Sequence, residues 1–147
     1  LMKCLVYASF ACIDFSENDL AQLATDAAAR NAESGVTGYL YFDNGRFMQY
    51  IEGEAWAIDL LIGRIERDTR HTIKRVVMDN DLETRRFPTW HMQWLKQGSL
   101  VNIRLEHILH SFLLLKTAHT SRYSMLEARV WQLVDKIADR HGISQGK

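Results

Sequence analysis

A turn signal between two apolar runs is the feature that most restricts how this 147-residue chain folds. Asp43-Asn44-Gly45 separates residues 36–42 from residues 46–52. Gly45 supplies the positive φ of a tight β-turn, because glycine has no Cβ atom to clash there. The sequence therefore predicts a β-hairpin whose side chains alternate between the two faces of a sheet.

Further elements surround this hairpin. Residues 3–10 form an apolar run typical of a strand, and Ser16 begins a helix with early acidic residues that ends at Ser34-Gly35. Residues 56–67 have the apolar spacing of a second helix. Residues 73–78 and 90–94 are predicted strands, with Trp90, Met92 and Trp94 sharing one face. The order predicts an α+β, ferredoxin-like βαββαβ(β) fold: a mixed or antiparallel five-stranded sheet with two helices on one face.

The composition shifts from Ser99 onward, and a C-terminal helical extension is expected. Ile103, His107, Leu109, Phe112 and Leu113 have helical spacing, and a last helix starts at Ser124 and stops at Gly142. A sheet with helices on one face needs a cover on the other, supplied by this extension or by a second chain. We expect a domain over residues 2–96, a helical cap or connector over 97–147, and a homodimer through the apolar residues 112–115.

Charge and cysteine content narrow the class of protein. Residues 1–60 hold three Lys or Arg against nine Asp or Glu, and residues 61–147 hold fifteen against nine. The basic residues are interleaved with acidic ones, which argues against a nucleic-acid partner. Apolar runs are far shorter than the ~20 residues that span a bilayer, and no signal peptide is recognisable. Two cysteines, expected to pack as small apolar residues, favour a reduced, cytoplasmic location.

Two polar residues interrupt apolar rows of the predicted sheet. Tyr7 shares a face with Leu5, and Gln49 shares a face with Phe47 and Ile51. An amide buried without partners costs roughly 1 to 3 kcal/mol for each unsatisfied group. The first and third strands are adjacent and central in a ferredoxin-like sheet, so the phenol and the amide are expected to bond to each other and to something above them.

A groove between the two helices is expected above this pair. Small residues of the first helix leave room there: Ala24, Ala27 and Ala28. Asn31, Arg64 and Asp68 form a polar rim, which suits a heterocycle. From spacing alone the alternative stays open that the alanines allow close helix packing and that Arg64 and Asp68 form a surface ion pair.

Five stretches resemble, in order, the BLUF family of blue-light sensors that use FAD. They are Tyr7-Ala8-Ser9, Ala29-Arg30-Asn31, residues 35–53, residues 65–71 and residues 85–94. The most specific parts are Gly35-Val36-Thr37-Gly38, Gln49, Glu52-Gly53 and Asp68-x-Arg70-His71. The chain departs from some relatives at Arg30, where they carry histidine or asparagine, and at Tyr50, where they carry tryptophan.

The resemblance implies a role for each matching residue. Tyr7, Asn31, Gln49 and Met92 would surround the flavin ring, with Asn31 on its C4 carbonyl and N3 edge, and Ser9 would also bind the cofactor. Arg64 and Asp68 would bind near the polar rim of the ring, and Arg70 and His71 toward the sugar or phosphate end. Trp90 corresponds to a semi-mobile tryptophan of the family.

The resemblance also implies how light acts. An electron and a proton leave Tyr7 through Gln49 and return, and Gln49 is left rotated or tautomerised. The fifth strand, with Met92 and Trp90, would pass the change to the C-terminal helices and a partner protein. The chain is then a photoreceptor with no net turnover. The alternatives are a sensor fragment of a larger light-regulated enzyme, a nucleotide cyclase or a cyclic-dinucleotide phosphodiesterase, and a binding protein of this fold without flavin.

Other conspicuous residues are given structural roles. His107, His110 and His119 lack a supporting carboxylate or cysteine and are expected at a surface or interface, not on a metal. Trp56 and Trp131 are expected to pack against the protein interior.

Overall fold

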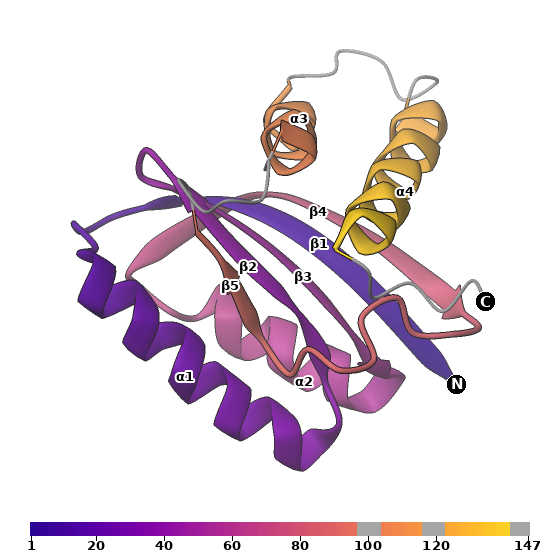
Figure 1. The fold of residues 1–147 in the computed structure, drawn as a ribbon, viewed down its shortest axis with the longest axis horizontal. Coiled ribbons are helices and arrows are strands. Elements are labelled where there is room, and N and C mark those ends of the chain that lie inside the picture. The colour runs from indigo at the N-terminus through magenta and orange to yellow at the C-terminus, as the bar shows by residue number, and fades with distance from the viewer. Residues whose placement is uncertain (97–103, 116–122, 142–147) are drawn as a thin grey trace.

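A computed structural model describes residues 1–96, 104–115 and 123–141 (Figure 1). The strands are β1 (Met2–Ala11), β2 (Thr37–Asp43), β3 (Arg46–Glu54), β4 (His71–Leu82) and β5 (Gln93–Leu95). The helices are α1 (Glu17–Ser34), α2 (Ala55–Glu66), α3 (Arg104–Leu113) and α4 (Tyr123–Arg140). The sheet order is β4-β1-β3-β2-β5, with β5 parallel to β2 and the other pairs antiparallel. The predicted ferredoxin-like α+β fold with a mixed five-stranded sheet is confirmed.

The hairpin turn and both ends of α1 lie where the sequence predicts them. The hairpin turns at Asn44 and Gly45, whose φ angles are 52° and 75°. Ser16 caps α1 by accepting a hydrogen bond from the Asp19 amide, and the Asp19 carboxylate accepts one from the Ser16 amide. Gly35 ends α1 in the left-handed conformation with φ of 73°. These contacts satisfy backbone groups that a helix end leaves unpaired.

The two faces of the sheet are covered by different helices (Figure 1). α1 and α2 lie on one face, where they enclose a core that includes Leu5, Leu40 and Ile51. α3 and α4 lie on the other face, over a second core that includes Tyr39, Tyr50 and Val134. The expected cover of the second face is therefore present within the chain. Among the described residues, no helix is long and apolar enough to cross a bilayer.

The segment before β5 differs from the prediction. Residues 90–94 are not one strand: β5 begins at Gln93. The Trp90 amide donates to the Phe87 carbonyl across a turn, so side chains do not alternate regularly here. Met92 and Trp94 face α1 and α2 as part of one core, whereas Trp90 packs into the opposite core. The prediction that all three share a face is wrong.

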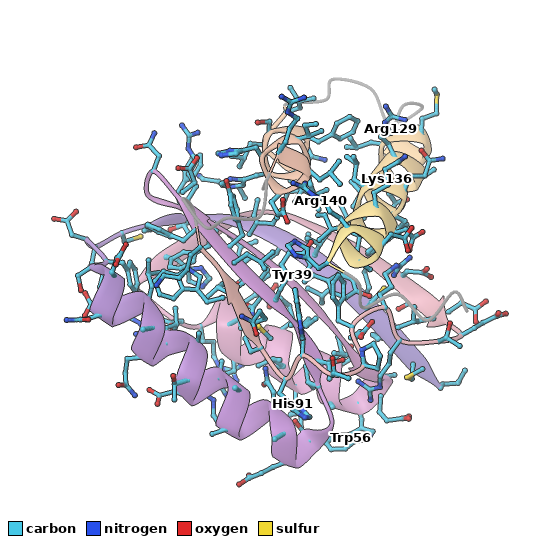
Figure 2. All side chains as sticks on the ribbon, in the orientation of Figure 1. Tyr39, Trp56, His91, Arg129, Lys136 and Arg140 are labelled. Carbon is cyan, nitrogen blue, oxygen red and sulfur yellow. The ribbon has the colours of Figure 1, made fainter. Side chains whose placement is uncertain are left out.

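Three further expectations are corrected. β4 runs from His71 to Leu82, beyond the predicted 73–78, because a strand at the sheet edge tolerates polar residues that hide it in the sequence. Trp56 is not an interior residue: 59% of it is exposed (Figure 2). Cys12 is exposed, whereas Cys4 is buried as expected.

Gly38 fixes how closely the sheet approaches the segment before β5. Its φ is 152°, and a Cβ atom there would lie 1.9 Å from the Tyr50 carbonyl oxygen. The Gly38 amide donates to the Trp90 carbonyl at 2.7 Å. Only glycine fits this position, and it holds the backbone of Trp90 against β2.

His110 joins α3 to the sheet as a buried ring. It is 4% exposed, contacts the ring of Tyr41 and lies near the charges of Asp43 and Arg46 and near His107. Its Nε2 atom has no hydrogen-bond partner among the described residues. Burial lowers the pKa of His110 to about 4, so the ring is neutral in the folded protein at pH 7. His119 lies outside the described residues.

We expect the stability of the fold to fall as pH drops from about 6.5 to 4. In this window the unfolded chain takes up a proton at His110 and the folded chain does not, at a cost of up to about 3 kcal/mol. Thermal melts of wild type and His110→Leu at pH 7 and 4.5 check this, and the variant should lose part of the pH dependence. The neighbouring variant His107→Gln should keep it. Equal pH dependence in wild type and His110→Leu would contradict the assignment.

Candidate functional site

Tyr7 and Gln49 are paired at the centre of the sheet. They are directly opposite in the β1–β3 register, and both are buried, at 4% and 6% exposure. The Tyr7 hydroxyl donates to Oε1 of Gln49 at 2.6 Å, and Nε2 of Gln49 donates to the sulfur of Met92 at 3.2 Å. A phenol, an amide and a thioether thus form a continuous buried chain from β1 across β3 to the residue just before β5.

The hydrogen bonds from Tyr7 through Gln49 to Met92 select one orientation of the Gln49 amide. With Oε1 toward Tyr7, the phenol donates to the amide oxygen and the amide nitrogen donates to Met92. In the rotated orientation the amide oxygen would face the Met92 sulfur, which has no proton to donate. The protein's own contacts therefore favour the first orientation by about one weak hydrogen bond, a small difference that a changed ligand contact can reverse.

A pocket opens beside the pair, between α1, α2 and the sheet. Seven residues singled out in the sequence line it: Tyr7, Asn31, Gln49, Arg64, Asp68, Arg70 and His71. Apolar residues form much of the remaining wall, among them Phe15, Leu23, Ala27, Leu40, Phe47, Leu61 and Ile65. Ser9 and Met92 lie one contact behind the wall, on His71 and Gln49 respectively.

Asn31 is oriented by the segment before β5. Its side-chain nitrogen donates to the His91 carbonyl at 3.3 Å, and the residue is 3% exposed. No described residue donates a hydrogen bond to its Oδ1 atom. Because Asn31 also lines the pocket, this oxygen remains available to accept a hydrogen bond from the N–H of a bound heterocycle.

The charged residues at the pocket rim do not form the ion pair between Arg64 and Asp68 that their spacing left open. Asp68 forms its ion pair with Arg70, at 2.6 Å, and not with Arg64 one turn before it. The hydrogen bond from the Arg70 side chain is the main reason that the pKa of Asp68 falls to about 2. Neither Arg30 nor Arg64, which also line the pocket, forms an ion pair with a described residue.

His71 supports the side of the pocket next to Tyr7. Its Nε2 atom lies 2.8 Å from the Ile65 carbonyl, which only accepts, so Nε2 carries the proton. In the neutral ring Nδ1 is then the acceptor for the Ser9 hydroxyl, at 2.8 Å. The ring meets that of Tyr7 edge-on, with centroids 5.9 Å apart. Ser9 thus orients the His71 ring, which packs against one side of the Tyr7 ring.

The Tyr7 phenol is held in its neutral form. Burial raises the pKa of Tyr7 well above its ordinary value, and the negative charge of Asp68 raises it further. The hydroxyl therefore keeps its proton at physiological pH and remains the donor to Gln49. A neutral phenol that gives up an electron becomes strongly acidic, so a nearby acceptor for its proton, here Gln49, matters.

Two polar clusters that the sequence did not reveal hold the opposite side of the sheet. Glu52 is fully buried, and its carboxylate accepts four hydrogen bonds, from the Tyr50 hydroxyl, the Thr37 hydroxyl and the amides of Arg86 and Phe87. Glu106 of α3 is also fully buried and accepts a hydrogen bond from His141 at 2.7 Å. Glu52 stands out in the sequence only as part of the Glu52-Gly53 motif, and residue spacing carries no signal for the pair of Glu106 and His141.

The comparisons with known proteins bear directly on this geometry. A family model described as "BLUF: Sensors of blue-light using FAD" matches residues 2–93. The chain belongs to the BLUF family. BLUF domains are flavin-binding sensors of blue light, and the sensor domain is not itself an enzyme. The match favours a light sensor over a binding protein of the same fold without flavin.

Relatives of this BLUF chain include much longer proteins. The photoactivated adenylate cyclase subunit beta of Euglena gracilis is 36% identical over 74 residues, which are 50% of this chain and 9% of that protein. The alpha subunit is 35% identical over 74 residues, 7% of its length. The matched segment thus spans less than a tenth of the length of these relatives.

Solved BLUF structures share the fold. BlrB, described as a BLUF protein in its dark state, has a TM-score of 0.69 and 26% identity, and the match covers 94% of this chain and 96% of BlrB. Klebsiella pneumoniae BlrP1, described with FMN and cyclic diGMP, has a TM-score of 0.60 and 32% identity over 74% of this chain and 30% of BlrP1. These matches support a flavin site in this BLUF domain.

Proposed function

We propose that this BLUF chain is an FAD-binding photoreceptor whose light response is carried by Tyr7 and Gln49. The observation that supports this most is the buried chain Tyr7–Gln49–Met92 at the wall of the pocket, with bonds of 2.6 and 3.2 Å. A structural sheet has no need of this costly polar row in an apolar core. A site that must change hydrogen bonds without changing its fold does need one.

The residues of the pocket fit a flavin. The apolar wall suits a flat ring, the free Oδ1 of Asn31 suits a ring N–H, and Arg64 suits a ring carbonyl. Asp68, Arg70 and His71 lie where polar groups beyond the ring would be bound. A bound flavin supplies a strong one-electron oxidant when it absorbs blue light. FAD is favoured over shorter flavins by the family to which the chain belongs.

The chain's own chemistry is a reversible transfer. With a bound, photoexcited flavin as the one-electron oxidant, Tyr7 would give up one electron, and its phenolic proton would move along the 2.6 Å hydrogen bond to Gln49. Both return to Tyr7, so nothing is consumed and no bond is permanently made. Gln49 is left rotated or tautomerised, because the two amide orientations differ by so little. The altered hydrogen bonds persist until the amide relaxes thermally.

An absorption spectrum of the purified chain loaded with FAD, taken before and after blue light, tests this function. We expect a small red shift of the flavin band that reverses in the dark. A flavin band that does not shift, or that bleaches irreversibly, would contradict the proposal. A chain that does not bind FAD would contradict it as well.

The segment before β5 is the proposed output route. Its three consecutive residues contact three parts of the protein. Met92 accepts a hydrogen bond from the Gln49 amide, and the His91 carbonyl accepts one from Asn31. Trp90 packs into the second core. The Trp90 ring stacks on Phe87 and lies 5.5 Å from the ring of His141, which bonds to Glu106. A rotation of Gln49 would therefore change the contacts of a segment that is also joined to α3 and α4.

His141→Gln is expected to separate light sensing from the response of the tail. Gln keeps a donor for Glu106 but lacks the ring that contacts Trp90, so the flavin shift should remain and the light effect on α4 should fall severalfold. Hydrogen exchange of α3 and α4, in the dark and under blue light, measures that effect. The exposed α4 variant Lys136→Gln is the control. An undiminished light effect in His141→Gln would exclude this route.

We infer that the chain forms a homodimer or binds a partner protein through the outer side of α3. Leu113 is buried within the chain, but Ile108 and Leu115 are 42% and 53% exposed. Ile108→Glu should therefore shift the chain toward monomer in sedimentation experiments, whereas Lys136→Glu on α4 should not. A monomeric wild type would contradict the homodimer and leave a different protein as the partner.

The second candidate is a sensor region of a larger light-regulated enzyme. The cyclase subunits of Euglena gracilis favour it, because they contain a matching segment within a far longer chain. The length of the native reading frame separates the two candidates. Two free cysteines, Cys4 and Cys12, support a reducing, cytoplasmic location for either one.

A further inference from the structure

A second hollow adjoins the flavin pocket, between the C-terminal half of α1 and the first three turns of α2. Four residues border both the hollow and the pocket: Arg30, Asn31, Leu61 and Arg64. Trp56 and Leu60 border the hollow and not the pocket. We call it the Trp56 hollow. It is a depression of the surface that shares one wall with the proposed flavin site.

The hollow presents two large apolar side chains to solvent. Trp56 and Leu60 lie one turn apart on α2 and are 59% and 64% exposed, whereas Ala57 and Ile58 are the residues that α2 buries. Figure 2 shows Trp56 at the edge of the molecule near the end of α1. Large apolar side chains that lie together at a surface with charged residues around them are typical of an interaction site. Tryptophan is also among the residues that most often dominate the binding energy of such a site.

The charge of the hollow is positive. Arg30 and Arg64 line it, no acidic residue of the described chain does, and neither arginine forms an ion pair with a described carboxylate. Asp59, on the same turn of α2 as Trp56, is already paired with Lys3 at 2.7 Å. A ring carbonyl is neutral, so a bound flavin would not cancel the charge of Arg64. A ligand with carboxylates beside its apolar groups therefore complements this surface.

The surroundings favour a protein segment over a nucleic acid. Glu33 and Glu66 are exposed on the same two helices, so the positive charge is confined to a spot and does not form the track that a phosphate backbone follows. Trp56 and Leu60 are spaced one helical turn apart, in a depression between two helices. This arrangement suits an amphipathic helix that lays its apolar side chains against them.

We propose that the Trp56 hollow is a docking site for an acidic, amphipathic segment of a partner protein. The apolar side chains of the segment cover Trp56 and Leu60, and its carboxylates pair with Arg30 and Arg64. This site is separate from the outer side of α3, which belongs to the opposite face of the sheet (Figure 1).

The link between this site and light rests on the proposed function. Asn31 lines both the hollow and the flavin pocket, and it donates to the His91 carbonyl in the segment before β5. A change of hydrogen bonds at the flavin edge therefore alters a wall of the docking site. The affinity for the partner segment should then differ between the dark and the illuminated chain.

Selection from a phage-displayed library of random peptides of about 16 residues tests the docking site. The FAD-loaded chain in the dark is the target, and Trp56→Ala is the counter-selection. We expect the retained peptides to combine large apolar residues with several Asp and Glu residues. The proposal is overturned if no peptide distinguishes wild type from Trp56→Ala, or if the retained peptides have no excess of acidic residues.

The most enriched peptide, labelled for fluorescence anisotropy, measures the contribution of each part. Trp56→Ala should weaken its binding at least tenfold, and Leu60→Ala about threefold. Ile13→Ala truncates a 51% exposed apolar residue outside the hollow and should leave the affinity unchanged. The same peptide with amides in place of its carboxylates should bind at least tenfold more weakly. Equal binding of the two peptides would exclude pairing with the arginines.

The flavin band reports whether the variants are folded. Trp56→Ala and Leu60→Ala should keep the light-induced shift of wild type, because neither side chain lines the flavin pocket. Loss of flavin binding in both variants would show that the two side chains are structural and would overturn the docking site. Binding of an oligothymidine that is lost in Trp56→Ala would identify a nucleic-acid surface and would overturn it as well.

A titration of the peptide in the dark and under blue light separates this inference from the proposed function. A severalfold change in affinity is expected. An unchanged affinity in a chain whose flavin band shifts would overturn the link through Asn31. A flavin band that stays fixed while the peptide still binds would overturn the proposed function and leave the docking site supported.

Discussion

Gln49→Leu is expected to abolish the light-induced shift of the flavin band and to leave the flavin bound. Leucine is close to glutamine in size, but it can neither accept the Tyr7 proton nor donate to Met92. The series of hydrogen bonds from Tyr7 to Met92 is then interrupted at its centre, and the site has no second amide orientation to adopt. Absorption spectra in the dark and after blue light, on matched amounts of loaded protein, measure the loss.

Two further variants make this test specific. Tyr7→Phe removes the phenolic electron and proton donor and should abolish the shift in the same way. Gln93→Leu makes the same chemical change at an exposed position of β5 and should leave the shift intact. A full shift in Gln49→Leu would exclude the relay role of this amide.

Glu52→Gln is expected to destabilise the fold by roughly 3 to 5 kcal/mol, even though the change removes only a charge. The carboxylate accepts four hydrogen bonds in a fully buried position. A glutamine turns an NH₂ group toward one hydroxyl and one backbone amide, and that amide, which can only donate, is left unsatisfied in a fully buried position. Because two of the donors are the amides of Arg86 and Phe87, the segment that leads to Trp90 and Met92 should loosen as well.

Thermal melts check this prediction, and a drop in Tm of about 10 °C is expected for a domain of this size. Glu54→Gln, two residues along the same strand in an exposed position, is the matched control and should change Tm by about a degree at most. If Glu52→Gln melted within two degrees of wild type, the buried carboxylate would not be the anchor of this segment.

The sequence was sufficient for the elements whose signals are local. The hairpin at Gly45 and the capped helix from Ser16 follow from residue chemistry alone, and the ferredoxin-like order predicts that Tyr7 and Gln49 are neighbours on adjacent strands. The tertiary bond between these two side chains was predictable because a ferredoxin-like order makes their strands neighbours. Such inferences need only the residue period of each element and the order of the strands in the sheet.

Predictions that required irregular backbone were less successful. Strict alternation over residues 90–94 predicts Trp90 on the same face as Met92, but the turn at residues 87–90 puts the two side chains on opposite faces. Glu52, Glu106 and His141 carried no spacing signal, since their partners come from distant segments. The exposure of Trp56 depends on how α2 packs, which the apolar period of a helix does not fix in detail.

An infrared difference spectrum, light minus dark, on the FAD-loaded chain with ring-labelled tyrosine tests the central claim most directly. We expect a light-induced shift of a tyrosine band that disappears in Tyr7→Phe and in Gln49→Leu, because the Tyr7–Gln49 hydrogen bond changes. A spectrum in which the flavin bands shift while every tyrosine band stays fixed would contradict it.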